Sequence, residues 1–171
     1  MRRLKRFWLP VLCVLLAVLT ACGAPAGEPE PERPLTCTVS VSCAALLDHM
    51  DLLDESKHAL VPEDGVLLPE TQVSFPAGES VYDVLQRVCE ASRLHMEAEF
   101  TPLYDSYYIQ GIGNLYEFDA GSLSGWMYAV NGWFPNYGCS RYELQDGDTV
   151  AWVYTCDLGA DVGGGSAAAG E

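Results

Sequence analysis

Cysteine is the residue type in this chain with the widest chemistry, because a thiol can bind a metal, act as a nucleophile or pair in a disulfide. The chain of 171 residues has seven cysteines. Two lie in the first 22 residues, and the others are Cys37, Cys43, Cys89, Cys139 and Cys156. No two of these five have the Cys-x-x-Cys spacing of thiol oxidoreductases, and the three histidines add no zinc-ligand spacing. We therefore favour structural disulfides over a redox or metal role. Because five is odd, at least one thiol must stay free, pair between chains or carry chemistry.

Other short motifs give no support for an enzyme, a metal site or a bound cofactor. Asp146-Gly147-Asp148 has carboxylates that could bind calcium, but it lacks the further ligands of an EF-hand loop, so we favour a hairpin turn. Gly111-Ile112-Gly113-Asn114 opens no helix and lacks the lysine of a phosphate-binding loop. No Gly-x-Ser-x-Gly nucleophile is present, and His95 lies in an alternating, strand-like segment. The sequence therefore predicts a protein that is not an enzyme.

Aromatic residues near the C-terminus form the most plausible functional surface. Trp126 and Tyr128 alternate with smaller residues, so they share one face of a predicted strand. The Asn131-Gly132 turn follows, and the rings after it are expected on a loop, where large rings often serve recognition. An alternative is that this loop folds back and caps the sheet edge. The candidate ligand-binding residues are Trp126, Tyr128, Trp133, Phe134, Asn136 and Tyr137.

The N-terminus has the three parts of a secretory signal. Basic residues in positions 1–7 precede the apolar run 9–19, and small residues precede Cys22. Leu19-Thr20-Ala21-Cys22 resembles the lipobox of bacterial lipoproteins, which implies that Cys22 carries a lipid and tethers the protein to the membrane from outside the cytoplasm. The alternative is an ordinary signal peptide cut near Ala21 or Ala24, which would release the protein.

Composition predicts one domain with a strongly acidic surface. Without residues 1–21 the chain has 150 residues, with five Lys or Arg against 24 Asp or Glu and a formal charge of −19. That charge argues against nucleic acid or anionic lipid as a partner. We divide the chain into a signal peptide (1–21), a Pro/Glu-rich spacer (22–34), one folded domain (35–158) and a flexible Gly/Ala tail (159–171).

Hydrophobic periodicity predicts the elements that position these residues. The clearest is a helix from Val81 to Cys89, with Ser80 and Asp83 as its capping box. A helical segment is expected over 44–60. Strands are expected over 35–43, 71–75, 94–100, 107–110, 115–118, 126–130, 142–144 and 149–155. The order indicates an α+β fold: a β-grasp-like mixed sheet crossed by one main helix, in a single domain.

The segments 124–140, 146–148 and 152–154, together with 75–85, resemble the transcobalamin-like C-terminal domain family. The resemblance spans about 73–162 and implies an extracytoplasmic β-grasp-like module with a face for a corrinoid such as cobalamin. In the vertebrate carriers a larger α-helical domain supplies much of the ligand cage, and this chain is too short to contain it. Relatives often have cysteine where this chain has Ala120, which would account for the odd number of thiols.

These observations predict a lipoprotein on the extracytoplasmic side of the cell membrane, anchored through Cys22. Its domain is expected to bind a small ligand, with a corrinoid as the candidate and the loop 133–137 as the contact. The alternative is a surface-interaction module that recognises a protein or a cell-wall polymer and no small ligand. A crosslinking role through the spare cysteine is the third reading.

Overall fold

A computed structural model describes residues 33–165 of the chain. The chain divides into two units, Met1–Arg33 and Pro34–Glu171, and the second is the folded unit considered below. The predicted signal peptide, Cys22 and nearly all of the predicted spacer lie outside the described residues. Within residues 33–165, no helix is long and apolar enough to cross a membrane.

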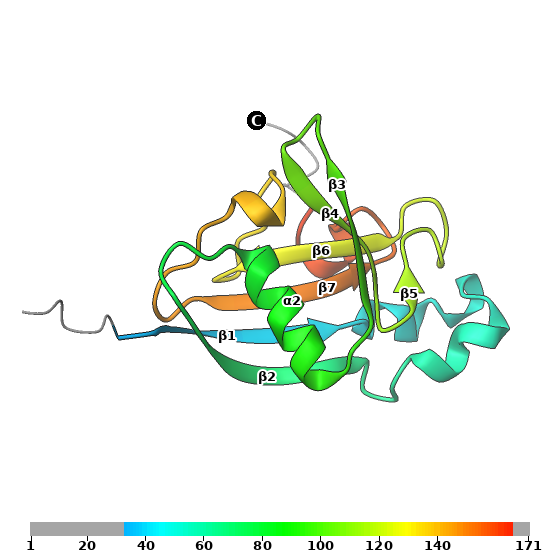
Figure 1. Ribbon diagram of the computed structural model, residues 1–171. Coiled ribbons are helices and arrows are strands. Elements are labelled where there is room, and N and C mark those ends of the chain that lie inside the picture. The colour runs from blue at the N-terminus through cyan, green and yellow to red at the C-terminus, as the bar shows by residue number, and fades with distance from the viewer. Residues whose placement is uncertain (1–32, 166–171) are drawn as a thin grey trace, which may run out of the picture. The chain divides into compact units, whose positions relative to one another are not determined.

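The main layer of the fold is a four-stranded mixed sheet with the order β2-β1-β7-β6 (Figure 1). Strand β1 pairs in parallel with β7, and the other two pairings are antiparallel. One face is apolar because alternate residues of β1, Cys37, Val39 and Val41, are buried. The strands are β1 (Leu35–Ser42), β2 (Val66–Phe75), β6 (Gly125–Val130) and β7 (Thr149–Thr155).

Helix α2 (Val81–Ser92) packs on the apolar face of this sheet, and Figure 1 shows it lying across β1 and β2. Ser80 Oγ accepts a hydrogen bond from Asp83 N at 3.3 Å, and Asp83 Oδ2 accepts one from Ser80 N at 2.8 Å. This capping box satisfies backbone N–H groups that a helix start leaves without partners. The helix ends at Ser92, and the C-cap residue Arg93 has a left-handed φ of 56°. The predicted helix and its cap are confirmed.

A second, three-stranded antiparallel sheet has the order β3-β4-β5, with β3 at Met96–Thr101, β4 at Ser106–Ile112 and β5 at Leu115–Tyr116. Side chains of the main sheet join it to the first layer. Trp126 Nε1 donates to Leu115 O at 2.8 Å, and Tyr154 Oη donates to Tyr116 O at 2.7 Å. The fold is thus a mixed α+β domain with one main helix, as the sequence predicts.

The structure differs from the prediction over residues 44–60. Three short 3-10 helices replace one longer helix: η1 (Ala44–Asp48), η2 (Met50–Leu52) and η3 (Glu55–Leu60). Only Leu46 and Leu53 of this segment are buried, so no continuous apolar stripe favours a regular helix. The predicted strand at 142–144 is also absent, because Glu143 forms only an isolated bridge with Ser80.

The start of the predicted flexible tail belongs to the folded unit. Asp161 Oδ2 accepts a hydrogen bond from Cys156 N at 2.7 Å, and Thr155 Oγ1 accepts one from Gly159 N at 2.7 Å. A Cβ on Gly164 would lie 3.0 Å from Phe134 Cδ1, so the backbone there approaches the ring closely. Residues 159–165, which include the short helix η5 (Ala160–Val162), are therefore packed. The prediction that the flexible tail begins at residue 159 rested on the many glycine and alanine residues of this segment.

The five cysteines of the folded unit form no disulfide in the part of the chain that the structure describes. All five are buried, on β1, after β1, on α2, at the helix η4 (Cys139–Arg141) and after β7. Burial raises the pKa of Cys139 to about 12 and the pKa of the others to about 11. Instead of the predicted disulfides, these residues fill the core as small apolar groups.

Candidate functional site

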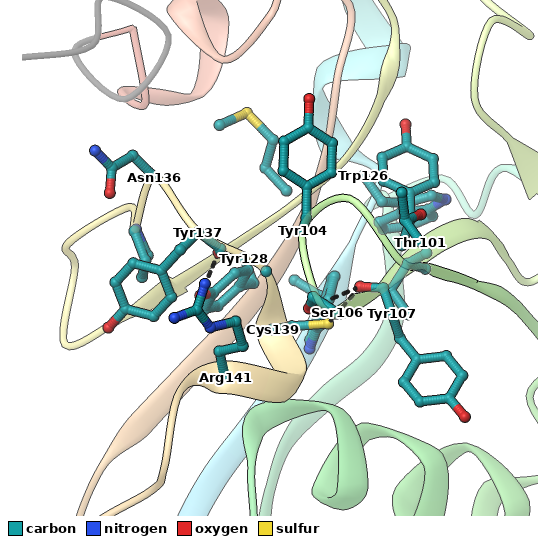
Figure 2. Close-up of a pocket in the computed structure, with 16 residues that line it drawn as sticks. Thr101, Tyr104, Ser106, Tyr107, Trp126, Tyr128, Asn136, Tyr137, Cys139 and Arg141 are labelled. Atoms are coloured by element: carbon teal, nitrogen blue, oxygen red, sulfur yellow. Dashed lines mark hydrogen bonds between the residues drawn. The ribbon is translucent and has the colours of Figure 1, made fainter.

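A cavity of about 450 Å³ lies between β4, β6 and the segment 135–141 (Figure 2). The tip of the β3–β4 hairpin contributes Thr101 and Tyr104, and β7 contributes Trp152. The lining is mainly aromatic: Tyr104, Tyr107, Tyr108, Trp126, Tyr128, Tyr137 and Trp152. An adjoining hollow of about 290 Å³ shares Tyr108, Trp126, Met127, Pro135 and Asn136 with it. The two hollows together offer an apolar surface that is longer than the cavity alone.

Alternation along β6 directs Trp126 and Tyr128 to the cavity, as the sequence predicts. Both side chains are held on the same face by aromatic neighbours in β7. The Trp126 ring meets Tyr154 edge-on at 5.3 Å between centroids, and Tyr128 lies 5.5 Å from Trp152. Tyr128 Oη donates to Tyr137 O at 2.9 Å, and burial raises its pKa, so the hydroxyl stays protonated. These rings are fixed before any ligand binds.

The predicted Asn131-Gly132 turn forms, with positive φ at both residues. Asn131 Nδ2 donates to Asp148 Oδ1 at 2.8 Å, which ties this turn to the one before β7. The Asp146-Gly147-Asp148 carboxylates thus have backbone and amide partners. No cluster of three or more His, Cys, Asp or Glu side chains arranged to hold a metal ion is found within residues 33–165.

The loop after this turn contributes only part of the predicted binding set to the cavity. Asn136 and Tyr137 line it, whereas Trp133 and Phe134 do not. Trp133 is 54% exposed and lies 6.1 Å from the Tyr137 ring, on the outer side of an aromatic cluster that includes Tyr142. Phe134 packs beside Gly164. The structure therefore brings together Trp126, Tyr128, Asn136 and Tyr137 and leaves the other two predicted residues outside.

The β3–β4 hairpin builds one wall of the cavity, which the sequence pattern did not predict. Tyr107 stacks on Tyr82 of α2, with ring centroids 4.2 Å apart and planes 2° from parallel. This contact fixes the hairpin against α2. The sequence signal that could have indicated this wall is the group of three tyrosines at positions 104, 107 and 108, close to a turn that contains proline.

Hydrogen bonds join this wall to helix η4. Ser106 Oγ lies 2.8 Å from Ser140 Oγ, which also accepts from Tyr107 N at 3.1 Å. Cys139 Sγ donates to Tyr107 O at 3.5 Å. A Cβ on Gly138 would lie only 1.9 Å from Ser106 Oγ, so this close approach requires glycine. Burial raises the pKa of the Cys139 thiol to about 12, so this thiol is protonated at neutral pH and is a weak nucleophile.

A protein-family model matches the part of the chain that forms this site. Residues 78–156 match a family model described as a domain of unknown function, DUF4430. Every residue that lines the cavity falls inside that match. No curated protein sequence matches the chain.

Among solved structures, the domain is similar to haptocorrin, from a crystal structure in complex with Cbi, at 13% identity and a TM-score of 0.52. The similarity covers 81% of this chain and 29% of that chain, so this chain spans under a third of haptocorrin. The fold is therefore transcobalamin-like. A protein from Ruminococcus gnavus ATCC 29149, described as metal-binding, is similar at 16% identity and a TM-score of 0.42, over 71% of this chain and 96% of that one.

Proposed function

We propose that this domain is a non-enzymatic module that binds a small ligand with a flat, apolar body in the aromatic cavity. The observation that carries the proposal is the convergence of seven aromatic side chains from three strands, the hairpin tip and one loop on a single cavity. Its volume of about 450 Å³ is within the usual range of ligand pockets. Flat conjugated ligands stack well on such rings.

A corrinoid is the first candidate ligand. Two findings support it: the resemblance to the transcobalamin-like C-terminal domain family and the similarity in fold to haptocorrin. A corrin ring with its side chains exceeds the volume of the cavity, so this domain would cover only part of it. The expected affinity is therefore modest, at about micromolar dissociation constants.

In this proposal the module is a member of that family and is held outside the cytoplasm by a lipid on Cys22. The support is the basic, apolar and small-residue order of the N-terminus, which ends in Leu19-Thr20-Ala21-Cys22. A tethered acidic domain stays soluble at the membrane surface while a ligand reaches its cavity.

Calorimetric titration of the purified full-length chain with cobalamin, its base-free precursor and heme tests the proposal. We expect saturable binding of a corrinoid that is tighter than any binding of heme. The substitution Tyr104→Ala, which removes a ring from the cavity wall, should weaken binding about three- to tenfold. Leu103→Ala is the matched control, because Leu103 is adjacent, 82% exposed and not part of the lining. Absence of heat with all three compounds would remove the corrinoid assignment.

An interaction surface for a cell-wall polymer is the second candidate function. The observation that favours it is the exposure of apolar side chains at the β3–β4 tip, where Phe100 is 45% and Tyr104 66% exposed. Co-sedimentation of the purified chain with insoluble peptidoglycan tests this function. If the exposed tip binds a cell-wall polymer, Leu103→Ala and Tyr104→Ala should weaken co-sedimentation equally. If the cavity binds a small ligand, only Tyr104→Ala should weaken binding of that ligand.

A further inference from the structure

The cavity differs in charge from the rest of the molecule. The chain has 24 Asp and Glu against nine Lys and Arg, and its formal net charge is −15. No acidic residue is among the residues that line the cavity, and Arg141 is the charged residue in that set. A cation without acidic neighbours in the lining would attract a negative group in a molecule that otherwise repels one.

Arg141 is positioned to present its side chain to a ligand. It is the last residue of helix η4, and its backbone N donates to Gly138 O at 3.0 Å. In Figure 2 its guanidinium group extends toward Tyr137 and Tyr128. The ion pairs recorded between described residues are Lys57 with Asp119 and Arg87 with Glu79, and no hydrogen bond of the Arg141 side chain is recorded among those residues. With respect to residues 33–165, its five N–H donors are therefore available.

A second donor in the cavity lining also lacks an acceptor. Trp152 is only 2% exposed, and its Nε1–H has no hydrogen-bond partner among the described residues. By contrast, the other cavity indole, Trp126, donates to Leu115 O. Trp152 lies beside Tyr128, the ring toward which Arg141 extends. The Trp152 Nε1–H is itself buried, so the donor that a ligand can reach is the exposed Arg141 guanidinium. A guanidinium donates but does not accept, which makes it complementary to an acceptor-rich group.

We propose that the ligand carries an anionic oxygen-bearing group that binds the Arg141 guanidinium, while the aromatic lining binds its apolar body. This inference rests on the proposed ligand-binding function and specifies the class of ligand. Guanidinium forms bidentate, charge-assisted hydrogen bonds with carboxylate, sulfonate or phosphate oxygens, which gives both affinity and orientation. Arg141 is thus the specificity-determining residue of the site.

The test uses two fluorescent probes with the same ring system. 8-Anilinonaphthalene-1-sulfonate carries an anionic group, and N-phenyl-1-naphthylamine lacks it. We expect the purified full-length chain to bind the sulfonate about tenfold more tightly than the neutral probe, with an affinity that falls as salt concentration rises. Inorganic phosphate at millimolar concentration should not displace the sulfonate probe, because a free anion lacks the apolar body.

Variants separate the role of Arg141 from a general effect of charge. Arg141→Gln should weaken binding of the sulfonate probe about tenfold and leave binding of the neutral probe unchanged, and Arg141→Lys should retain part of the affinity. Arg93→Gln is the matched control: it removes the same charge at an exposed position after α2 and should change neither affinity.

The possible outcomes distinguish this inference from the proposed function. If both probes bind equally and Arg141→Gln changes neither affinity, the anionic assignment is wrong and the cavity remains a ligand site. If inorganic phosphate displaces the sulfonate probe, the site recognises a free anion, and the assignment to an anion with an apolar body is wrong. If neither probe binds, the proposed function itself fails.

Discussion

At the scale of single residues, the cysteines and the cavity rings show what a sequence pattern can and cannot reveal. Alternation correctly placed Trp126 and Tyr128 on one buried face, because strand geometry is local. The prediction of structural disulfides rested on the expected compartment and on the absence of Cys-x-x-Cys or zinc-ligand spacing, which do not report where each thiol lies. In the structure each thiol of the folded unit is a separate core group. Within residues 33–165 no ion pair of Arg141 is found, and this could not be predicted from sequence, since it depends on which acidic residues fold near it.

The buried thiols predict a dependence of stability on alkaline pH. Burial raises the pKa of Cys139 to about 12 and that of Cys37 to about 11, above the value of 9.0 for a free thiol. An acid whose pKa is raised by folding contributes stability that is complete below the unfolded pKa and lost as pH rises through the folded pKa. We therefore expect the free energy of unfolding to decrease between about pH 9 and pH 11.

Urea unfolding at pH 7, 9, 10 and 11 measures this decrease. Cys139→Ala is the informative variant: it should lower stability at pH 7 through lost packing, and its stability should fall less steeply above pH 9. In the wild type, Ellman's reagent at pH 8 should react with Cys139 only after denaturation. Rapid reaction of Cys139 in the folded protein, or a disulfide that includes Cys139 in mass spectrometry under non-reducing conditions, would contradict the burial argument.

At the scale of elements, local signals predicted α2 and most strands but not their arrangement. The Ser80 capping box and the helical spacing of Val81, Val84 and Leu85 are contained within one segment. Residues 44–60 fold as 3-10 turns because tertiary contacts to Leu46 and Leu53, rather than helix propensity, fix their course. The cavity wall formed by the β3–β4 hairpin was missed for a similar reason: its position depends on the stacking of Tyr107 on Tyr82, 25 residues away in sequence.

The capping box gives an element-scale prediction. Ser80→Ala removes the acceptor for Asp83 N and should lower the free energy of unfolding by about 1 kcal/mol. Ser92→Ala, at the exposed last position of the same helix, makes the same chemical change with no recorded side-chain hydrogen bond and should alter stability by less than about 0.5 kcal/mol. Chemical denaturation of both variants provides the comparison. Equal effects would show that the cap does not stabilise α2.

At the scale of the whole molecule, the folded unit is an acidic α+β domain with an aromatic cavity whose lining includes the positively charged Arg141. The sequence predicted a single domain of this class, because length, charge and element order suffice for that. It placed the binding surface on the exposed loop at Trp133, since a ring on a loop is visible in sequence whereas a cavity is not. In the structure, strands, hairpin and loop together form the cavity, and Trp133 lies outside it.

The most direct test of the account is therefore an NMR titration of the purified chain with 8-anilinonaphthalene-1-sulfonate, observing the indole N–H signals assigned by single Trp→Phe variants. Binding in the cavity predicts saturable shifts for Trp126 and Trp152, which line it, and little change for Trp133. Shifts of Trp133 with unchanged signals of the other two would place the ligand on the exposed loop and contradict the cavity as the binding site.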